Sequence, residues 1–501
     1  MRLYWLSLLT GVLTGVVTLP YRYVLERADG FRSYFFDRPH AWWFHLLMLG
    51  GMWVVALCID RIVRCFPVVS GSGIPQIEGA IYGRFRFLRP GRALLATFVG
   101  GAAGIGMGLS LGREGPSVQM GGFVARLVGR WFGSDAAEQR YLYTGGASAG
   151  LSAAFSAPLA SSIFIVEEVM RFDSVRITVS SLLSAVVAGG MARIVLRGNV
   201  FDGLSTVWPE GMAFCQLGVA LGLFSVLLAG MGLVFNRSLL SFGLRYGLLK
   251  IGVAWKLLGV VVLTYLLGFF CSDLLAGGER FLLREGLPTA GSGLVYLTAA
   301  ILFKLFYTPL CYATGFPGGI FLPLLVCGGL LGKWVALVLV LTGWMGPEHA
   351  GFFMVIGMAG LFGVVVRSPV TGIVLILEMS QKFNLIFPMV VVVSLSYFIS
   401  SIAGVKPIYD SLYRNLLPKK LQKSDKRTVI AFLVNGGSYL DGKRADGVLL
   451  PEGCVLRRVK RAGRWMGAAG FRLREGDEVF IELFSRDIER LYRPLRGLAD
   501  E

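Results

Sequence analysis

Three acidic residues lie in or beside apolar and glycine-rich segments, where water is scarce. Glu114 is the centre of Gly112-Arg113-Glu114-Gly115-Pro116, and Glu167 and Glu168 close the apolar run SSIFIV. A carboxylate in such a segment is costly to ionise, and residues of this kind usually bind an ion or carry a proton. These acids are therefore the first candidates for chemistry, whereas Arg113 is assigned no transport role.

Glycine and proline interrupt the apolar sequence at three places. The interruptions are GSGIP at 71–75, GREGP at 112–116 and GFPGGIFLP at 315–323, and an apolar run follows each one. Proline suits the first turn of a helix, where its missing N–H has no intrahelical acceptor, and glycine lets backbone amides approach a ligand closely. Each interruption predicts a helix N-terminus with accessible amides.

Converging helix N-termini can bind an anion without a full cationic charge. The first four N–H groups of a helix lack partners, and the helix dipole places about half a positive charge there. Moderate affinity suits transport, because a conducted ion must also leave its site. The alternative is that glycine and proline only kink packed membrane helices, as they often do.

Composition indicates which elements position these motifs. Of the 501 residues, 55% are hydrophobic and 16% are charged, and the mean hydropathy is +0.66. These values exclude an ordinary soluble protein and predict an all-α polytopic membrane protein. Apolar stretches of spanning type lie at 3–24, 46–63, 213–235, 253–271 and 390–402. The first is interpreted as a retained helix, because no small-residue cleavage site follows it.

The membrane region repeats itself. Residues 146–169 can be laid over 357–380, which places Pro158 opposite Pro369 and Glu167 opposite Glu378. Duplication with short, interrupted hydrophobic segments is typical of transporters whose site lies between the repeats near the bilayer midplane. The pairing of Glu167 predicts a structural role shared by both halves. Glu168 has no acidic counterpart, which favours a functional role, although an interfacial surface acid at a helix end is the alternative.

The composition changes at Pro418, where a basic cluster begins. We predict a transmembrane domain at 1–417, a basic linker at 418–427 and a small cytoplasmic regulatory domain at 428–501. Short β-prone runs separated by turn residues fill the last segment: TVIAFLV, GVLL, CVLRRVKR, FRL and EVFIELF. The order LPEGCVLRRVKR, glycine-rich turn and LREGDEVFIEL resembles the TrkA-C (RCK-C) module of potassium-transport gating subunits. Its nucleotide-binding half is missing, so the ligand of this tail is unknown.

Charge and residue usage exclude several classes of function. The net charge of +18 predicts a cytoplasmic C-terminal segment and contact with anionic membrane lipid rather than with nucleic acid. Seven dispersed cysteines and three histidines indicate no disulfide framework, metal site or cofactor. An intramembrane enzyme would need a catalytic set that these residues do not supply, so we expect no enzymatic activity and no catalytic residues.

Four motifs together resemble the CLC family of chloride channels and transporters. They are GSGIP, GREGP, GFPGGIFLP and Lys406-Pro407-Ile408-Tyr409, in the family's order and spacing across residues 1–417. The resemblance implies an inverted internal repeat with broken helices and a homodimer with one pore in each subunit. It implies anion contacts from the motif residues, in particular from the hydroxyls of Ser72 and Tyr409 and the amides of Ile320 and Phe321. The complete implied anion-binding set is Ser72, Gly112, Glu114, Gly115, Ile320, Phe321 and Tyr409.

The same resemblance implies how protons and chloride are coupled. Glu114 matches the family's external gate, and Glu168 matches the internal proton acceptor of its exchangers. We therefore predict a secondary active chloride/proton antiporter of the cell inner (plasma) membrane; a passive voltage- or pH-gated chloride channel on the same fold is the alternative. Ser72 favours chloride over nitrate, and no effect is assigned to Gln76. A potassium-transport subunit is disfavoured because the sequence lacks a TVGYG-like filter.

Overall fold

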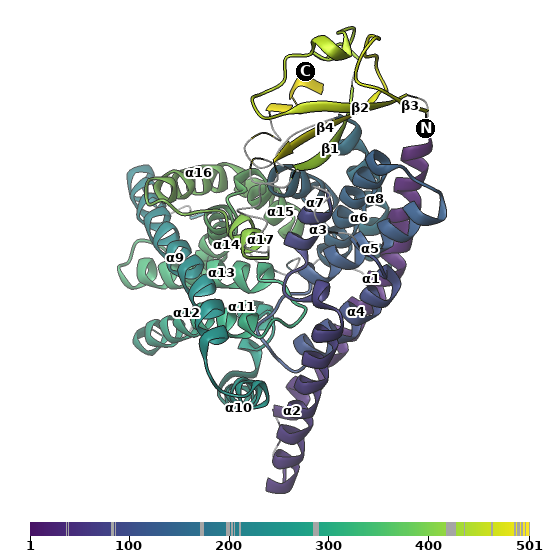
Figure 1. Cartoon of the computed structure of the whole chain (residues 1–501). Helices are drawn as coiled ribbons and strands as arrows, with labels where there is room; N and C mark the ends of the chain where they lie inside the picture. Colours follow the sequence, from purple (N-terminus) through teal and green to yellow (C-terminus); the bar gives the residue numbers. More distant parts are fainter. Residues whose placement is uncertain are drawn as a thin grey trace.

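A computed structural model describes most of the chain. It describes residues 1–501 except 37, 39, 82–84, 86, 171–174, 197–200, 202–203, 205, 210–211, 284–289, 417–426, 435, 462–463, 485–486, 488–490, 492–493, 496 and 500–501. The predicted basic linker 418–427 thus lies outside the described residues, apart from Arg427, with which the first strand begins. Figure 1 shows a large helical body with a small β domain at one end.

The first half of the helical body runs from α1 to α8. These helices are α1 Arg2–Phe36, α2 Trp42–Cys65, α3 Ile74–Ile81, α4 Pro90–Gly106, α5 Glu114–Trp131, α6 Ala136–Phe155, α7 Pro158–Phe164 and α8 Val175–Leu196. The end of α7 continues as a π-helical turn at Ile165–Met170. The predicted retained first helix is α1, which packs along α6 and α8.

The second half runs from α9 to α17. These helices are α9 Phe214–Leu248, α10 Val253–Cys271, α11 Glu279–Leu283, α12 Ala290–Ala313, α13 Phe321–Leu341, α14 Ala350–Val366, α15 Pro369–Ser380, α16 Ile386–Ile402 and α17 Ile408–Leu416. Among the described residues, nine helical segments are long and apolar enough to cross a membrane. Helices α3, α7 and α17, of 8, 7 and 9 residues, are too short to span about 30 Å of hydrocarbon. The predicted combination of spanning and broken helices is confirmed.

In each half, one pair of helices packs through glycine residues that lie in close backbone contact. In the first half, a Cβ atom on Gly121 of α5 would lie 1.9 Å from the carbonyl oxygen of Gly146 in α6. In the second, a Cβ atom on Gly328 of α13 would lie 2.3 Å from the carbonyl oxygen of Gly357 in α14. Small residues allow such close backbone approach in membrane helices. The repeat alignment pairs Gly146 with Gly357, so both halves use the same contact.

The C-terminal domain contains a four-stranded antiparallel sheet of order β1-β4-β2-β3. Its strands are β1 Arg427–Leu433, β2 Val455–Arg461, β3 Arg464–Met466 and β4 Glu478–Phe484. Two of the predicted β-prone runs are not strands. The run 447–450 follows a 3-10 turn and precedes Pro451, which cannot donate to a ladder. In the run 471–473, Arg472 makes only an isolated bridge to Arg444.

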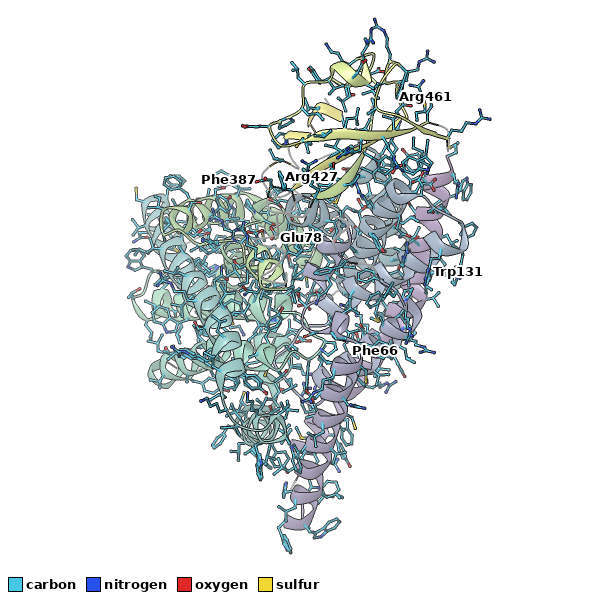
Figure 2. The ribbon with its side chains drawn as sticks, viewed as in Figure 1. Phe66, Glu78, Trp131, Phe387, Arg427 and Arg461 are labelled. Carbon is cyan, nitrogen blue, oxygen red and sulfur yellow. The ribbon has the colours of Figure 1, made fainter. Side chains whose placement is uncertain are left out.

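The β domain contacts the starts of α6 and α8. The guanidinium of Arg140 donates a hydrogen bond to the carbonyl oxygen of Ala431 in β1, and Arg176 forms an ion pair of 3.3 Å with Glu475. Figure 2 shows Arg427 on the side of the domain that faces the helical body. The β domain is therefore attached directly to two helices of the first half, α6 and α8.

The raised pKa of Glu478 links the stability of the β domain to pH. Its side chain is buried, and burial together with nearby Asp135 raises its pKa, while Lys460 and Arg140 act in the opposite direction. A carboxyl with a raised pKa binds its proton more tightly in the folded protein than in the unfolded chain. The stability that this group contributes is thus fully present below the ordinary pKa of 4.5 and is lost as the pH rises through the raised value.

Hydrogen exchange measures this pH dependence. After correction for intrinsic exchange rates, we expect stronger protection of the β4 amides at about pH 5 than at about pH 7.5. Glu478→Gln should abolish the difference. A difference of the same size in Glu478→Gln would assign the pH effect to another group.

Candidate anion and proton site

The three glycine and proline interruptions meet at one place. The amide of Gly318 donates to the carbonyl oxygen of Gly71 at 3.0 Å. Gly112 and Gly319 exchange two backbone hydrogen bonds of 2.7 and 2.8 Å, which makes them an isolated antiparallel bridge. The starts of α3, α5 and α13 are thus held together across more than 200 residues of sequence, as an anion site built from helix N-termini requires.

Glycine is needed here because the backbones almost touch. Gly71 and Gly73 have φ values of +74°, a region that side chains with a Cβ atom rarely adopt. A Cβ atom on Gly115 would lie 2.4 Å from the carbonyl oxygen of Ser72, and one on Gly319 would lie 2.5 Å from Oε1 of Glu114. The site is therefore lined by the backbone atoms of glycine residues, which carry no side chain.

The carboxylate of Glu114 lies on the N-terminus of α13. The residue is fully buried, and its Oε1 accepts hydrogen bonds from the amides of Phe321 at 2.6 Å and Leu322 at 3.1 Å. Its Oε2 has no hydrogen-bond partner among the described residues. An acidic oxygen thus occupies a position where unpaired N–H groups and the helix dipole would also hold a free anion.

The donors to Glu114 overlap with the amides that the family resemblance implies for the anion. Phe321 belongs to both sets, Leu322 is a further donor to Glu114, and Ile320, whose amide stays a predicted anion contact, is the N-cap residue of α13. The sequence contained a signal for Leu322, since the first N–H groups of any helix are unpaired as a set.

Two buried hydroxyls have no hydrogen-bond partner. Ser72 and Tyr409 are each 1% exposed, and neither Ser72 Oγ nor the Tyr409 hydroxyl is bonded within the described part of the chain. Tyr312 lies beside Ser72, but the two hydroxyls do not meet the geometry of a hydrogen bond. Buried polar groups are nearly always satisfied, so two unpaired donors near one site indicate a ligand.

Aromatic contacts connect Tyr409 to the start of α13. Its ring lies 6.1 Å from that of Phe164, which in turn lies 5.7 Å from Phe321, measured between ring centroids. The Tyr409 hydroxyl is also within electrostatic range of both Glu114 and Glu168. The three residues named from separate motifs therefore belong to one region.

Glu168 lies on the wall of a cavity of about 790 Å³. The residue is 3% exposed, and its Oε2 accepts a hydrogen bond of 3.2 Å from Ser368 Oγ. Polar and charged residues of the same wall include Glu167, Thr178, Arg367, Tyr397 and Lys406. The side chain of Glu168 therefore borders open space in spite of its low exposed fraction. Ser368, the N-cap residue of α15, was not identified from the sequence.

Glu167 and Glu378 stabilise the two halves reciprocally. Glu167 accepts hydrogen bonds from Thr371 in the first turn of α15, through the amide at 2.8 Å and the hydroxyl at 2.6 Å. Glu378 accepts hydrogen bonds in the first turn of α7 from the amides of Leu159 at 3.1 Å and Ala160 at 2.7 Å. Each acid thus caps a helix of the opposite repeat, which is the shared structural role expected from their alignment.

Removing one of these caps should lower stability without removing transport. We expect Glu378→Gln to reduce the free energy of unfolding by about 1–2 kcal/mol, because a charged acceptor at a partly buried helix N-terminus becomes neutral. Thermal unfolding in detergent with tryptophan fluorescence measures the change. An unchanged midpoint would mean that solvent replaces the cap at no cost.

Comparison with known proteins completes the description of the site. Residues 51–401 match the family model described as voltage gated chloride channel. The chain is 33% identical over 445 residues to the H(+)/Cl(-) exchange transporter ClcA of Vibrio cholerae, covering 84% of this chain and 91% of that protein. It is 33% identical over 443 residues to the ClcA protein of Cronobacter sakazakii, covering 83% and 90%.

Solved structures agree with these matches. A slow cyanobacterial Cl⁻/H⁺ antiporter superimposes with a TM-score of 0.74 at 30% identity, covering 83% of this chain and 98% of that one. A CLC-type fluoride/proton antiporter superimposes with a TM-score of 0.64 at 23% identity, covering 80% and 95%, and supports the fold alone.

Proposed function

The chain belongs to the voltage-gated chloride channel family, and from this premise we propose that it is a secondary active antiporter that exchanges chloride for protons. The observation that carries the proposal is the Glu114 carboxylate, which accepts hydrogen bonds from the amides of Phe321 and Leu322 at the N-terminus of α13. A residue that binds protons occupies the place of the transported anion. Proton and anion movement are then linked by competition for one site.

Chloride is proposed to pass the site in contact with neutral donors. The hydroxyls of Ser72 and Tyr409 are available for a central anion, and their lack of partners supports this role. Gly112 and Gly115 let the chain approach the ion, and the N-terminus of α13 supplies positive potential. When Glu114 is ionised it takes the amides itself, and when protonated it loses that attraction and releases the position to chloride.

Protons are proposed to reach Glu114 from the opposite side through Glu168. Support comes from the cavity beside Glu168 and from the Ser368 hydroxyl that donates to its carboxylate. Tyr409 lies within range of both acids, so proton and chloride routes approach each other there. A passive channel would need no second acid at this depth, and the curated relatives are exchangers, which favours antiport.

We further propose that the protein is a homodimer in the cell inner membrane with its β domain in the cytoplasm. The basic C-terminal segment supports this orientation by the positive-inside rule. The β domain is proposed to be a TrkA-C-like regulatory module, supported by its strand and turn order and by its attachment to α6 and α8.

Liposome flux tests the proposal. Purified protein is reconstituted with a chloride gradient and no proton gradient, and potassium with valinomycin holds the voltage near zero. Proton movement driven by the chloride gradient under these conditions would establish antiport. Chloride flux without coupled protons would establish a channel and remove the role of Glu168.

A further inference from the structure

The segment that leads into Glu114 is held by the opposite half of the molecule. This gate segment, residues 107–112, connects the end of α4 to the start of α5. One face of α12 contacts it through residues spaced i, i+3, i+4 and i+7, which share a side of a helix. These residues are Lys304, Tyr307, Thr308 and Cys311.

The contacts reach both backbone and side chains of the gate segment. The Tyr307 hydroxyl donates to the carbonyl oxygen of Gly108 at 3.2 Å. At Ser110, the amide donates to Cys311 Sγ at 3.3 Å and the hydroxyl lies 2.8 Å from Thr308 Oγ1. The segment is thus attached to α12 at two of its six residues.

Lys304 is the charged member of this face and is fully buried. Its Nζ donates to Ser110 Oγ at 3.1 Å and to the carbonyl oxygens of Ala276 at 2.8 Å and Gly277 at 3.1 Å. Three oxygens match the three N–H donors of an ammonium group. Among the described residues no carboxylate lies within ion-pair distance of Lys304, and its three hydrogen-bond acceptors are neutral oxygens, while Glu279 acts on it electrostatically from farther away.

Such a residue is expensive if it serves packing only. A buried charge that forms no direct ion pair costs several kcal/mol in a membrane interior, and an apolar side chain of similar length would avoid that cost. A role in transport would explain why a lysine is present.

The position of the gate segment determines the position of the Glu114 carboxylate. Gly112 is joined to Gly319 by two hydrogen bonds, and a Cβ atom on Gly112 would lie 2.1 Å from Oε1 of Glu114. The carboxylate therefore rests against the backbone of the segment that Lys304 and its neighbours hold.

We propose that Lys304 is a positioning residue for the gate: through Ser110 it holds the gate segment in the register that seats Glu114 on the amides of α13. The inference rests on the proposed function, because it requires Glu114 to control the anion route. Without the ammonium, the segment shifts more easily and the carboxylate leaves its amides more often. Chloride then passes without a proton.

A double-mutant cycle tests this role. In liposomes, Lys304→Met should lower the ratio of proton to chloride flux by about tenfold, the factor expected for one charge-assisted hydrogen bond. In the Glu114→Ala background it should change chloride flux by less than about twofold, because the gate is already absent. Lys256→Met is the matched control, since this lysine donates to the carbonyl oxygen of Tyr246, away from the gate segment; its flux ratio should equal that of the wild type.

Ser110→Ala provides a second variant if Lys304→Met does not fold. It removes the acceptor on the gate segment and keeps the lysine, so it should lower the flux ratio in the same direction. A wild-type flux ratio in Lys304→Met, or in Ser110→Ala where the first variant does not fold, would overturn the proposal. Equal losses of chloride flux in both backgrounds would do the same and make Lys304 a general structural residue. Proton coupling that persists in Glu114→Ala alone would instead overturn the proposed function and this inference with it.

Discussion

Glu114→Ala is expected to conduct chloride while moving no coupled protons. The substitution removes the carboxylate that occupies the amides of Phe321 and Leu322, so the anion route stays open at every pH. We expect chloride-driven proton flux to fall by at least about 100-fold, the lower range for loss of a positioned acid–base group. Chloride flux should also lose its dependence on external pH, because its titrating competitor is gone.

Glu114→Gln removes the negative charge of the side chain but keeps a side chain of similar size at the amides of α13. Its side-chain oxygen can still accept from the Phe321 amide, but the side chain neither ionises nor carries a proton. We expect no proton coupling and slower chloride flux than in Glu114→Ala. Paired chloride-electrode and pH-electrode recordings from the same liposomes give both fluxes, and chloride-driven proton pumping in either variant would exclude Glu114 as the gate.

Glu168→Ala is expected to stop proton transport and preserve chloride transport. The side chain lies beside the cavity and accepts from Ser368, while the amides at Glu114 are left intact. We expect coupled proton flux to fall by at least about 100-fold, as for any removed relay acid. Chloride flux should remain within a few-fold of the wild type.

The adjacent acid provides the control for this experiment. Glu167 is occupied by the amide and hydroxyl of Thr371, so Glu167→Gln should lower the unfolding temperature but keep proton coupling. If Glu167→Gln lost proton coupling while Glu168→Ala kept it, Glu167 would be the internal proton acceptor and Glu168 the structural residue. Full coupling in both variants would place the internal acceptor elsewhere.

The sequence by itself determined most of the architecture, because the rules involved are local or periodic. Span length follows from runs of apolar residues, helix starts follow from Pro75, Pro116 and Pro323, and the repeat is visible by direct alignment. The same alignment separated Glu167 from Glu168, and the structure gives Glu167 the shared capping role. Strands at 427–433, 455–461 and 478–484 follow from β-prone runs bounded by turns.

Only the tertiary structure decided which groups meet. Phe321 and Leu322 donate to Glu114 because a contact between residues more than 200 positions apart depends on where α13 begins and how its axis points. Ser368 reaches Glu168 for the same reason. In the sequence, Lys304 is a single cation within an apolar helix. Its hydrogen bond to Ser110 of the gate segment forms only because α12 packs against the other repeat. Periodicity determines the face on which a side chain lies, but the partner of that face is set by long-range packing.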